Sequence, residues 1–342
     1  MPETMRAARY HGPGDSLRLE EVPIPQPGAG EALVRVTAAG VCHTELHFLS
    51  GVLNLGVAPL TLGHEMAGEV AQVGPGVTSV RPADRVIVYY YLGCGACHWC
   101  RTGQENLCDA LVAEYGFVSD GGLAEYVRVP ARNLVKLPAN LSFEEAATLG
   151  CSATTAIHAA GLARLAPGDV ALVYGFGGVG AALVQYCDLA GARVLAVGRS
   201  PAKLQLARDL GVEAAIDATR EDVPARVREL TEGQGADVVF ELVGTAESMP
   251  KAVASLRKRG RLVFIGYSED LLTVSPIQLV VLEAQVLGSV GNTLDELSRA
   301  VDLAAAGAIR ATIDRVVPLE DVNRVLDDLR QGKVVGRAVV RP

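Results

Sequence analysis

The sequence predicts an α/β protein with two domains, one of them built on a doubly wound parallel sheet. Its 342 residues exceed the roughly 250–300 that a single core usually organises. Residues 1–150 consist of short alternating runs separated by Gly and Pro, which is typical of a β-rich domain with a barrel-like or rolled sheet. After about residue 150, apolar strands alternate with helical segments, which indicates a parallel sheet covered on both faces.

Apolar patterns place the individual elements of the second half. They predict helices at residues 178–190 and 203–210, and strands at 170–174, 194–197, 236–244 and 260–266. Beyond residue 290, the patterns predict amphipathic helices within 293–307 and 319–332 and a last strand within 333–340. These last elements can extend the parallel sheet or return to the first domain.

Composition excludes several classes of partner. The net charge is −8, so a nucleic-acid backbone would be repelled overall, and there is no Lys/Arg run to offset this. No apolar run approaches the roughly 18–20 residues that span a bilayer, and the N-terminus has no signal-peptide pattern. We therefore expect a cytoplasmic protein without nucleic-acid or membrane partners, in which clustered cysteines indicate metal binding or catalysis rather than disulfides.

Residues 175–180, GFGGVG, fit the pattern G-x-G-x-x-G, which alone is a weak signal. Here it follows an apolar strand and begins a helix, the context in which it binds a dinucleotide. Gly175 would make the tight turn, Gly177 would let the backbone approach a pyrophosphate, and Gly180 would let the helix pack on the strand. Gly178 and Val179 would present the helix N-terminus to the phosphates. The alternative is a plain tight turn between strand and helix.

The end of the second strand indicates which nicotinamide cofactor to expect. An NAD site usually has an acidic residue there for the ribose hydroxyls, but this sequence has Gly198. Arg199 and Lys203 would attract a 2′-phosphate, and Ser200 can donate a hydrogen bond to it. NADP(H) is therefore favoured. NAD(H) remains the alternative, in which Arg199 is a solvated surface charge.

Four of the seven cysteines lie within fifteen residues, spaced C-x2-C-x2-C-x7-C: Cys94, Cys97, Cys100 and Cys108. Four thiolates close a tetrahedral zinc site and leave no position for a substrate. An iron–sulfur cluster also takes four cysteines, but usually at other spacings. The spacing favours structural zinc.

The other three cysteines are scattered along the chain. Cys187 falls in the helix after the glycine motif and is expected to pack in the core. Cys42 and Cys151, with His64, would make three ligands of a catalytic zinc that keeps a fourth position open. Because they span more than a hundred positions, spacing alone does not connect them.

The ordered motifs GVCHTELH, LGHEMAGEV, the cysteine run, GCSATTA, GFGGVG and GKVVGR resemble those of zinc-dependent alcohol dehydrogenases in the medium-chain dehydrogenase/reductase superfamily. The resemblance covers essentially the whole chain. It implies a GroES-like catalytic domain at residues 1–151 and 291–342, which carries the structural zinc lobe, and a Rossmann domain at 152–290. It also implies two zinc ions per chain, one catalytic on Cys42, His64 and Cys151, and one structural on the clustered cysteines.

The resemblance also assigns roles around the catalytic zinc. Glu65 matches a mobile carboxylate that can approach the metal during ligand exchange. Thr44 matches the hydroxyl that takes the alcohol proton, and His47 matches the outer member of the relay to solvent. Glu45 matches an acid that hydrogen-bonds the ligand histidine and fixes its ring. Tyr90 matches a position that lines the substrate pocket.

Three further positions resemble cofactor contacts. His43 and Arg337 match residues that hold the pyrophosphate, and Thr155 matches one that packs on the nicotinamide. Relatives acting on polyols usually have a Glu where Cys151 stands, so simple alcohols, aldehydes or ketones are the expected substrates. The spacing resembles that of bacterial tetrameric relatives, so a homo-oligomer is expected, a tetramer before a dimer. The alternatives are an NAD-dependent secondary-alcohol or polyol dehydrogenase, an alkene reductase, whose relatives generally lack the metal ligands, and a zinc-ribbon binding module.

Overall fold

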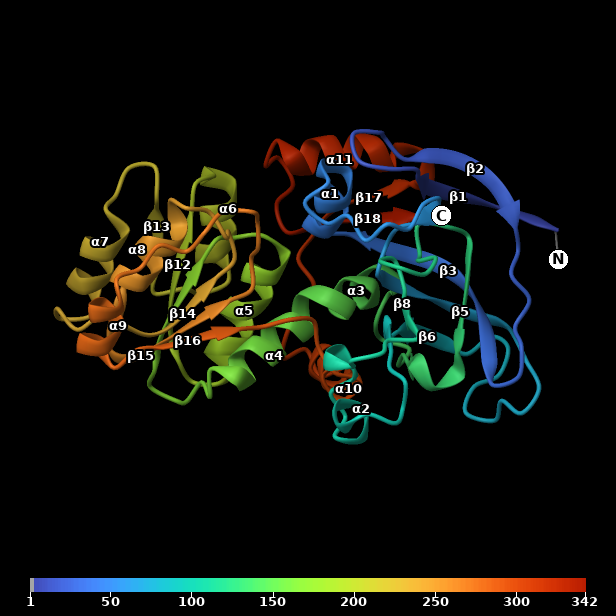
Figure 1. The fold of residues 1–342 in the computed structure, drawn as a ribbon, viewed down its shortest axis with the longest axis horizontal. Helices are drawn as coiled ribbons and strands as arrows, with labels where there is room; N and C mark the ends of the chain where they lie inside the picture. The colour runs from blue at the N-terminus through green and yellow to red at the C-terminus, as the bar shows by residue number, and fades with distance from the viewer. Residues whose placement is uncertain (1–2) are drawn as a thin grey trace. The chain divides into compact units, whose positions relative to one another are not determined.

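The computed structural model describes residues 3–342, and the chain divides into two compact units. The first unit comprises Met1–Thr154 and Asn292–Pro342, and the second comprises Thr155–Gly291. The boundaries expected from the sequence lie three residues and one residue earlier. Figure 1 follows the chain through the first unit, into the second, and back to the first for its last helices and strands.

The second unit contains a six-stranded sheet in which all neighbouring strands are parallel. Its order is β13-β12-β11-β14-β15-β16, so the chain starts in the middle and winds to each edge in turn. The strands are β11 (Val170–Tyr174), β12 (Arg193–Gly198), β13 (Ala214–Asp217), β14 (Ala236–Glu241), β15 (Leu256–Phe264) and β16 (Gln285–Gly288). The helices are α4 (Thr154–Leu162), α5 (Gly178–Leu189), α6 (Pro201–Asp209), α7 (Val223–Leu230), α8 (Ser248–Ala254) and α9 (Pro276–Leu282).

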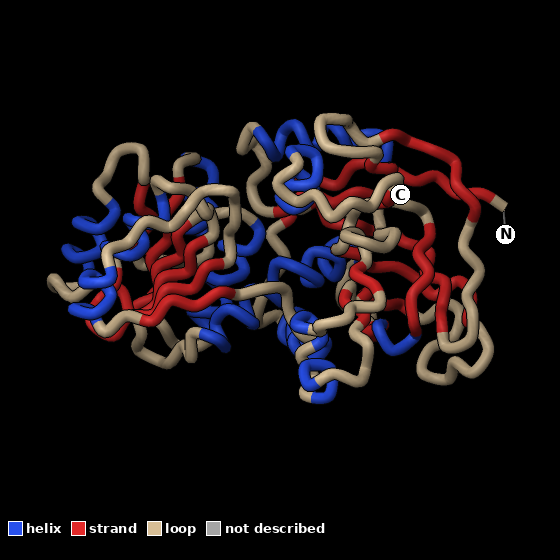
Figure 2. The backbone as a smooth tube through the Cα atoms, in the orientation of Figure 1, coloured by secondary structure: helices blue, strands red, loops and turns tan. Residues whose placement is uncertain are grey.

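Helices cover both faces of this sheet, as Figure 2 shows for the red strands and blue helices of this unit. Alternate strand residues enter two separate hydrophobic clusters because successive side chains of a strand point to opposite faces. Val173 of β11 packs in one cluster with residues of α4, α5 and α6. Leu172 packs in the other with residues of α7 and α8. The predicted doubly wound parallel sheet is confirmed.

The first unit has a seven-stranded, mostly antiparallel sheet whose central strand is the long β3. Its pairing order is β10-β6-β5-β3-β18-β17, with β9 also paired to β3. The strands are β3 (Glu31–Val41), β5 (Glu65–Val73), β6 (Arg85–Val88), β9 (Tyr126–Pro130), β10 (Leu134–Lys136), β17 (Ile313–Pro318) and β18 (Arg337–Arg341). Since β18 pairs with β3, the C-terminal segment returns to the first unit and does not extend the parallel sheet.

Smaller elements complete this unit. Two minor sheets join β1 (Thr4–Tyr10), β2 (Arg18–Pro23) and β4 (Leu60–Thr61), and β7 (Tyr91–Leu92) with β8 (Ala113–Glu114). The helices are α1 (His43–Ser50), α2 (His98–Arg101), α3 (Phe143–Thr148), α10 (Leu294–Ala305) and α11 (Val322–Arg330). A 3₁₀ turn precedes α11, so the helix predicted at 319–332 begins at Val322. Within residues 3–342, none of the helices combines the length and the apolar character needed to cross a membrane.

Candidate metal and cofactor sites

The clustered cysteines converge on a single point. Their four Sγ atoms all lie within 4.8 Å of one another. Cys94 and Cys100 have their Sγ atoms 3.9 Å apart, and Cys97 and Cys108 have theirs 3.8 Å apart. A tetrahedron with Zn–S bonds of about 2.3 Å has edges of about 3.8 Å. The donor set and its spacing therefore fit a closed, four-thiolate zinc site.

Backbone N–H groups around this lobe are aimed at the sulfurs. Cys94 Sγ accepts from the N–H groups of Ala96 (3.5 Å) and Cys97 (3.4 Å), and Cys97 Sγ accepts from the N–H of Cys100 (3.5 Å) as α2 begins. The donors at Ala96 and Cys97 lower the pKa of Cys94 to about 6. Such donors stabilise thiolates, which are the form that binds metal.

A second group brings together residues that are far apart in sequence. One ligand atom from each of Cys42, His64, Glu65 and Cys151 lies within 4.8 Å of the others, and all four side chains are buried. Cys42 follows β3 and caps α1, His64 immediately precedes β5, and Cys151 lies in the π-helical turn Leu149–Ala153. A helix N-cap, the residue before a strand and a π-helical turn thus direct two thiols and an imidazole toward the same point.

Glu45 fixes the orientation of Cys42 and His64. Its Oε2 accepts a hydrogen bond from the backbone N–H of Cys42 at 2.7 Å, which forms part of the capping box of α1. Its Oε1 lies 3.2 Å from Nδ1 of His64. With Nδ1–H donating to Glu45, Nε2 of His64 is left as the metal-binding atom. Glu45 is 1% exposed, so this orientation is held without competition from water.

Neighbouring charges in the group shift the pKa values of Cys42 and His64 toward their charged forms. A hydrogen bond with Cys151 lowers the pKa of Cys42, and the positive charge of Arg337 adds to this effect. Burial alone would lower the pKa of His64, but Glu45 and Cys42 together raise it above its ordinary value. A buried cluster of thiol, imidazole and carboxylate with these mutual shifts fits a bound divalent cation.

Glu65 faces the same point from β5. Burial raises its pKa to about 8, although Arg337 opposes this shift. Arg337 Nη2 lies 3.0 Å from Glu65 Oε1, yet neither carboxylate oxygen has a hydrogen-bond partner of good geometry among residues 3–342. The carboxylate fits only because Gly40 is opposite, since a Cβ there would lie 2.0 Å from Glu65 Oε2. A buried carboxylate with so few donors fits a site for a cation.

The remaining predicted residues of the catalytic group lie around it. Thr44 Oγ1 is 3.6 Å from Cys42 Sγ. His47 is half-buried, one helical turn after the exposed His43, and the two rings meet edge to face with centroids 5.1 Å apart. Burial and then the charge of His43 lower the pKa of His47. Thr155 is buried at the start of α4.

In the second unit, the glycine motif has the predicted context between β11 and α5. A Cβ on Gly180 would lie 2.6 Å from the carbonyl oxygen of Gly175, so the close approach of helix and turn excludes a side chain there. A Cβ on Gly177 would meet nothing within 4 Å. Gly177 is also the N-cap of α5, without any side-chain cap. The N-terminus of α5 is therefore open to a phosphate.

The end of β12 presents Gly198, exposed Arg199 and half-buried Ser200, and α6 begins at Pro201 with Lys203 in its first turn. Asp217, at the end of β13, pairs in register with Gly198, which the sequence did not reveal. Its Oδ1 accepts two hydrogen bonds from Thr219, one from the backbone N–H (2.9 Å) and one from the hydroxyl (2.6 Å).

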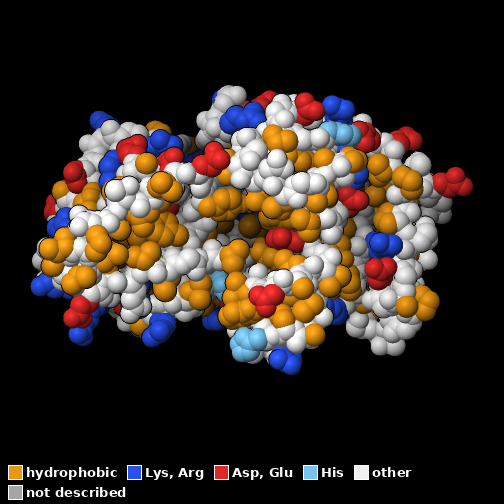
Figure 3. All heavy atoms as spheres, in the orientation of Figure 1, with side chains coloured by type: hydrophobic (Ala, Val, Ile, Leu, Met, Phe, Trp, Pro, Cys, Tyr) orange, Lys and Arg blue, Asp and Glu red, His pale blue; other side chains and the backbone are white. Residues whose placement is uncertain are grey.

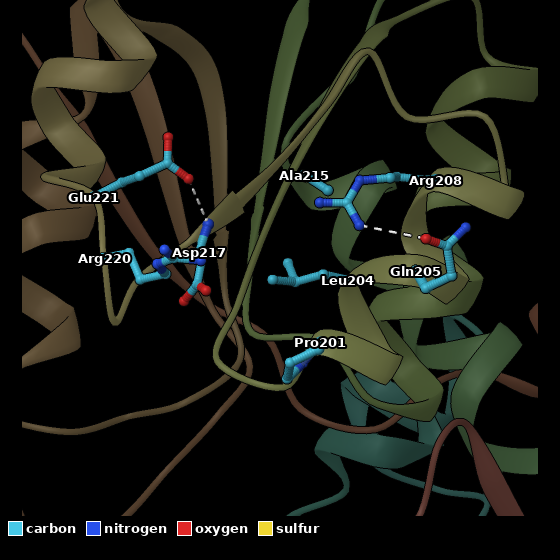
Figure 4. A pocket seen from close by; sticks show the side chains of 8 residues that line it. All are labelled: Pro201, Leu204, Gln205, Arg208, Ala215, Asp217, Arg220 and Glu221. Carbon is cyan, nitrogen blue, oxygen red and sulfur yellow. Dashed lines mark hydrogen bonds between the residues drawn. The ribbon is translucent and has the colours of Figure 1, made fainter.

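Figure 4 shows the pocket of about 490 Å³ that Asp217 lines, between α6 and the end of β13. Arg208, Arg220 and Glu221 project from opposite walls of this pocket, and Leu204 forms part of its lining. Asp217 of β13 therefore places a carboxylate near the end of β12, where β12 itself ends in Gly198 and has no acidic residue.

The chain matches two family models and several known enzymes. Residues 28–139 match the alcohol dehydrogenase GroES-like domain, and residues 178–306 match the zinc-binding dehydrogenase family. An alcohol dehydrogenase from Geobacillus stearothermophilus is 37% identical, covering 98% of this chain and 99% of the relative. An NAD-dependent alcohol dehydrogenase from Sulfurisphaera tokodaii is 36% identical, covering 99% and 100%.

Two solved structures share the fold over nearly the whole chain. The alcohol dehydrogenase of Aeropyrum pernix superposes with a TM-score of 0.93 at 35% identity, covering 98% of this chain and 100% of that one. A zinc-binding dehydrogenase from Sinorhizobium meliloti bound to NADP gives a TM-score of 0.90 at 30% identity, covering 100% of both. The fold and the two cysteine-containing sites define a zinc-type nicotinamide-dependent dehydrogenase. The chain belongs to the zinc-dependent alcohol dehydrogenases of the medium-chain dehydrogenase/reductase superfamily.

Proposed function

We propose that this enzyme interconverts a simple alcohol and its aldehyde or ketone, with one catalytic and one structural zinc ion per chain and with NADP(H) as the favoured cofactor. The observation that carries the proposal is the buried group of Cys42, His64 and Cys151, whose imidazole is oriented by Glu45. Two thiolates and a neutral imidazole make three ligands, which leaves a fourth position for the substrate.

Residues around the metal ligands carry out proton transfer and assist ligand exchange. When bound, zinc supplies a Lewis acid for the alcohol oxygen, and the nicotinamide accepts the hydride. Thr44, whose hydroxyl lies 3.6 Å from Cys42 Sγ, takes the alcohol proton. His47 passes this proton to solvent, and its lowered pKa leaves it neutral and able to accept. Glu65, balanced by Arg337, supplies a buried carboxylate that assists ligand exchange.

The cofactor preference rests on Gly198, Arg199, Ser200 and Lys203. Two cations and a hydroxyl beside a strand end without its own acid favour a 2′-phosphate. NAD(H) is the second candidate because Asp217, in register with Gly198, offers a carboxylate nearby, and because three relatives are named NAD-dependent alcohol dehydrogenases.

Steady-state kinetics with both cofactors test this preference, with a Gly198→Asp variant as the comparison. A Cβ at position 198 would lie 3.2 Å from the end of the Leu204 side chain and 3.7 Å from Phe176 Cβ, so a small shift of the Leu204 side chain accommodates the aspartate. We expect the parent to have the higher kcat/KM with NADPH and the variant to shift toward NADH. A parent that already prefers NADH would refute the NADP assignment and leave the dehydrogenase assignment intact.

We also infer a homo-oligomer, a tetramer before a dimer. β16 is an edge strand, and none of the residues of the preceding helix α9 is fully buried, with Ile277, Val280 and Val281 each more than 60% exposed. Figure 3 shows hydrophobic side chains gathered over this part of the second unit. An open strand edge beside an exposed apolar helix is a typical assembly surface. Light scattering tests the inference, and a monomer at micromolar concentration would contradict it.

The proposed alcohol oxidation is tested by measuring cofactor reduction by the zinc-loaded protein with primary and with secondary alcohols. We expect cofactor reduction that disappears when zinc is removed by a chelator and returns when zinc is added back. Turnover that persists without zinc would contradict the proposal. Polyol oxidation in preference to simple alcohols would favour the alternative substrate class.

A further inference from the structure

Glu114 lies at the far end of an aromatic cluster that begins at the candidate catalytic metal ligands. The ring of His64 contacts the rings of Tyr90 and Phe117, with centroid distances of 5.3 Å and 5.1 Å. Tyr90 stacks on Phe117 with centroids 5.8 Å apart and lies 4.4 Å from the ring of Tyr91. Tyr91 in turn is the strand partner of Glu114, and it opposes the rise that burial causes in the pKa of the Glu114 carboxyl group.

The polar groups of this cluster lie close to one another. Asn292 Nδ2 donates to Tyr90 Oη at 3.3 Å, and burial and then Tyr91 raise the pKa of Tyr90, while burial and then Glu114 raise the pKa of Tyr91. Both tyrosines are buried, at 3% and 4% exposure, so their positions are fixed by packing. The cluster is therefore a closely packed aromatic group with a single carboxylate at one end.

That carboxylate is half-buried and lacks a cation of its own. Among residues 3–342, no Lys, Arg or His forms an ion pair with Glu114. Burial raises its pKa to about 7, while the charge of His64 and the Tyr91 hydrogen bond oppose the rise. A carboxylate beside aromatic faces, with only one hydrogen-bond donor, is an environment that a cation would stabilise.

We propose that Glu114, with the rings of Tyr90 and Phe117, selects alcohols in which an aromatic spacer joins the hydroxyl to a positively charged ammonium group. The inference rests on the proposed function, since it places the reacting hydroxyl beside His64. The aromatic rings contact the spacer and the face of the cation, and Glu114 accepts a hydrogen bond from the ammonium. An anionic group at the same place is repelled.

The test compares 4-(aminomethyl)benzyl alcohol with 4-ethylbenzyl alcohol, which has the same shape without the charge. Both kcat/KM and Kd are measured on the zinc-loaded enzyme at about pH 8, where the amine is protonated and most Glu114 is ionised. The variants are Glu114→Gln and Glu114→Asp, with Glu21→Gln on the exposed face of β2 as the matched control for loss of one carboxylate.

We expect the parent and Glu21→Gln to prefer the ammonium substrate, and Glu114→Gln to lose about tenfold or more of that preference, the worth of one charged hydrogen bond. Glu114→Asp should retain part of it, which a purely structural role would not predict. An unchanged ratio of Kd values in Glu114→Gln, or a parent that does not prefer the ammonium alcohol, overturns the inference. Failure of turnover with a preserved Kd ratio would instead count against the proposed reaction.

Discussion

The two cysteine-containing sites of the first unit assemble their metal donors by opposite routes. The clustered site takes four thiols from fifteen consecutive residues, is partly exposed, and is supported by local backbone N–H groups. The scattered site takes its donors from three separate elements, is fully buried, and is supported by Glu45, Glu65 and Arg337. A local site can stabilise a loop by itself, whereas a site assembled by the fold can expose one metal position to a substrate.

The largest expected effect is on turnover when the scattered site loses a ligand. Cys42→Ser should lower kcat/KM on the order of a thousandfold, because Lewis-acid catalysis supplies several kcal/mol. The melting temperature should change little, since the β3–α1 junction keeps its Glu45 contacts. Full turnover in this variant would show that Cys42 does not hold the catalytic metal.

The clustered site should show the reverse pattern. Cys97→Ser should lower the melting temperature by about 10 °C because metal binding contributes directly to the folding of such lobes. His98→Ala, at the exposed first residue of the helix that Cys97 caps, is the matched control and should leave stability unchanged. If Cys97→Ser removed turnover without affecting stability, the roles of the two sites would have to be exchanged.

A smaller effect, on zinc affinity at the scattered site alone, is expected when Glu45 is replaced. Glu45→Gln keeps an acceptor for the Cys42 N–H but turns an amide toward Nδ1 of His64, which favours the wrong tautomer. We expect zinc affinity at the scattered site to fall about 10–100-fold, as competition with a chelator would measure. The affinity of the clustered site should be unchanged, and parallel losses at both sites would indicate general misfolding.

The smallest effect concerns the surface support of the lobe. Arg132 Nη1 pairs with Glu105 at 2.7 Å, and its side chain is 51% exposed. Arg132→Ala should cost less than about 1 kcal/mol in the free energy of unfolding, because exposed ion pairs contribute little. Denaturant titration checks this value, and a loss of several kcal/mol would mean that the lobe depends on this pair more than on its metal.

Sequence reasoning succeeded where a signal is local. The glycine motif, the alternation of apolar strands with helices and the cysteine run each lie within a few consecutive residues, so pattern and chemistry predict them together. The convergence of Cys42, His64 and Cys151 followed only from resemblance, because the π-helical turn that aims Cys151 has no sequence signature. Asp217 and Glu114 gain their surroundings from neighbouring strands, which no local pattern describes.

Zinc content, measured together with the coordination of the metal, tests the central claim most directly. The parent should contain about two zinc ions per chain, and Cys42→Ser about one, whose X-ray absorption spectrum shows sulfur ligands only. Cys97→Ser should retain the site with mixed sulfur and nitrogen ligands. A parent with one zinc ion per chain, or an all-sulfur spectrum lost in Cys42→Ser and kept in Cys97→Ser, would contradict the division into a local structural site and an assembled catalytic one.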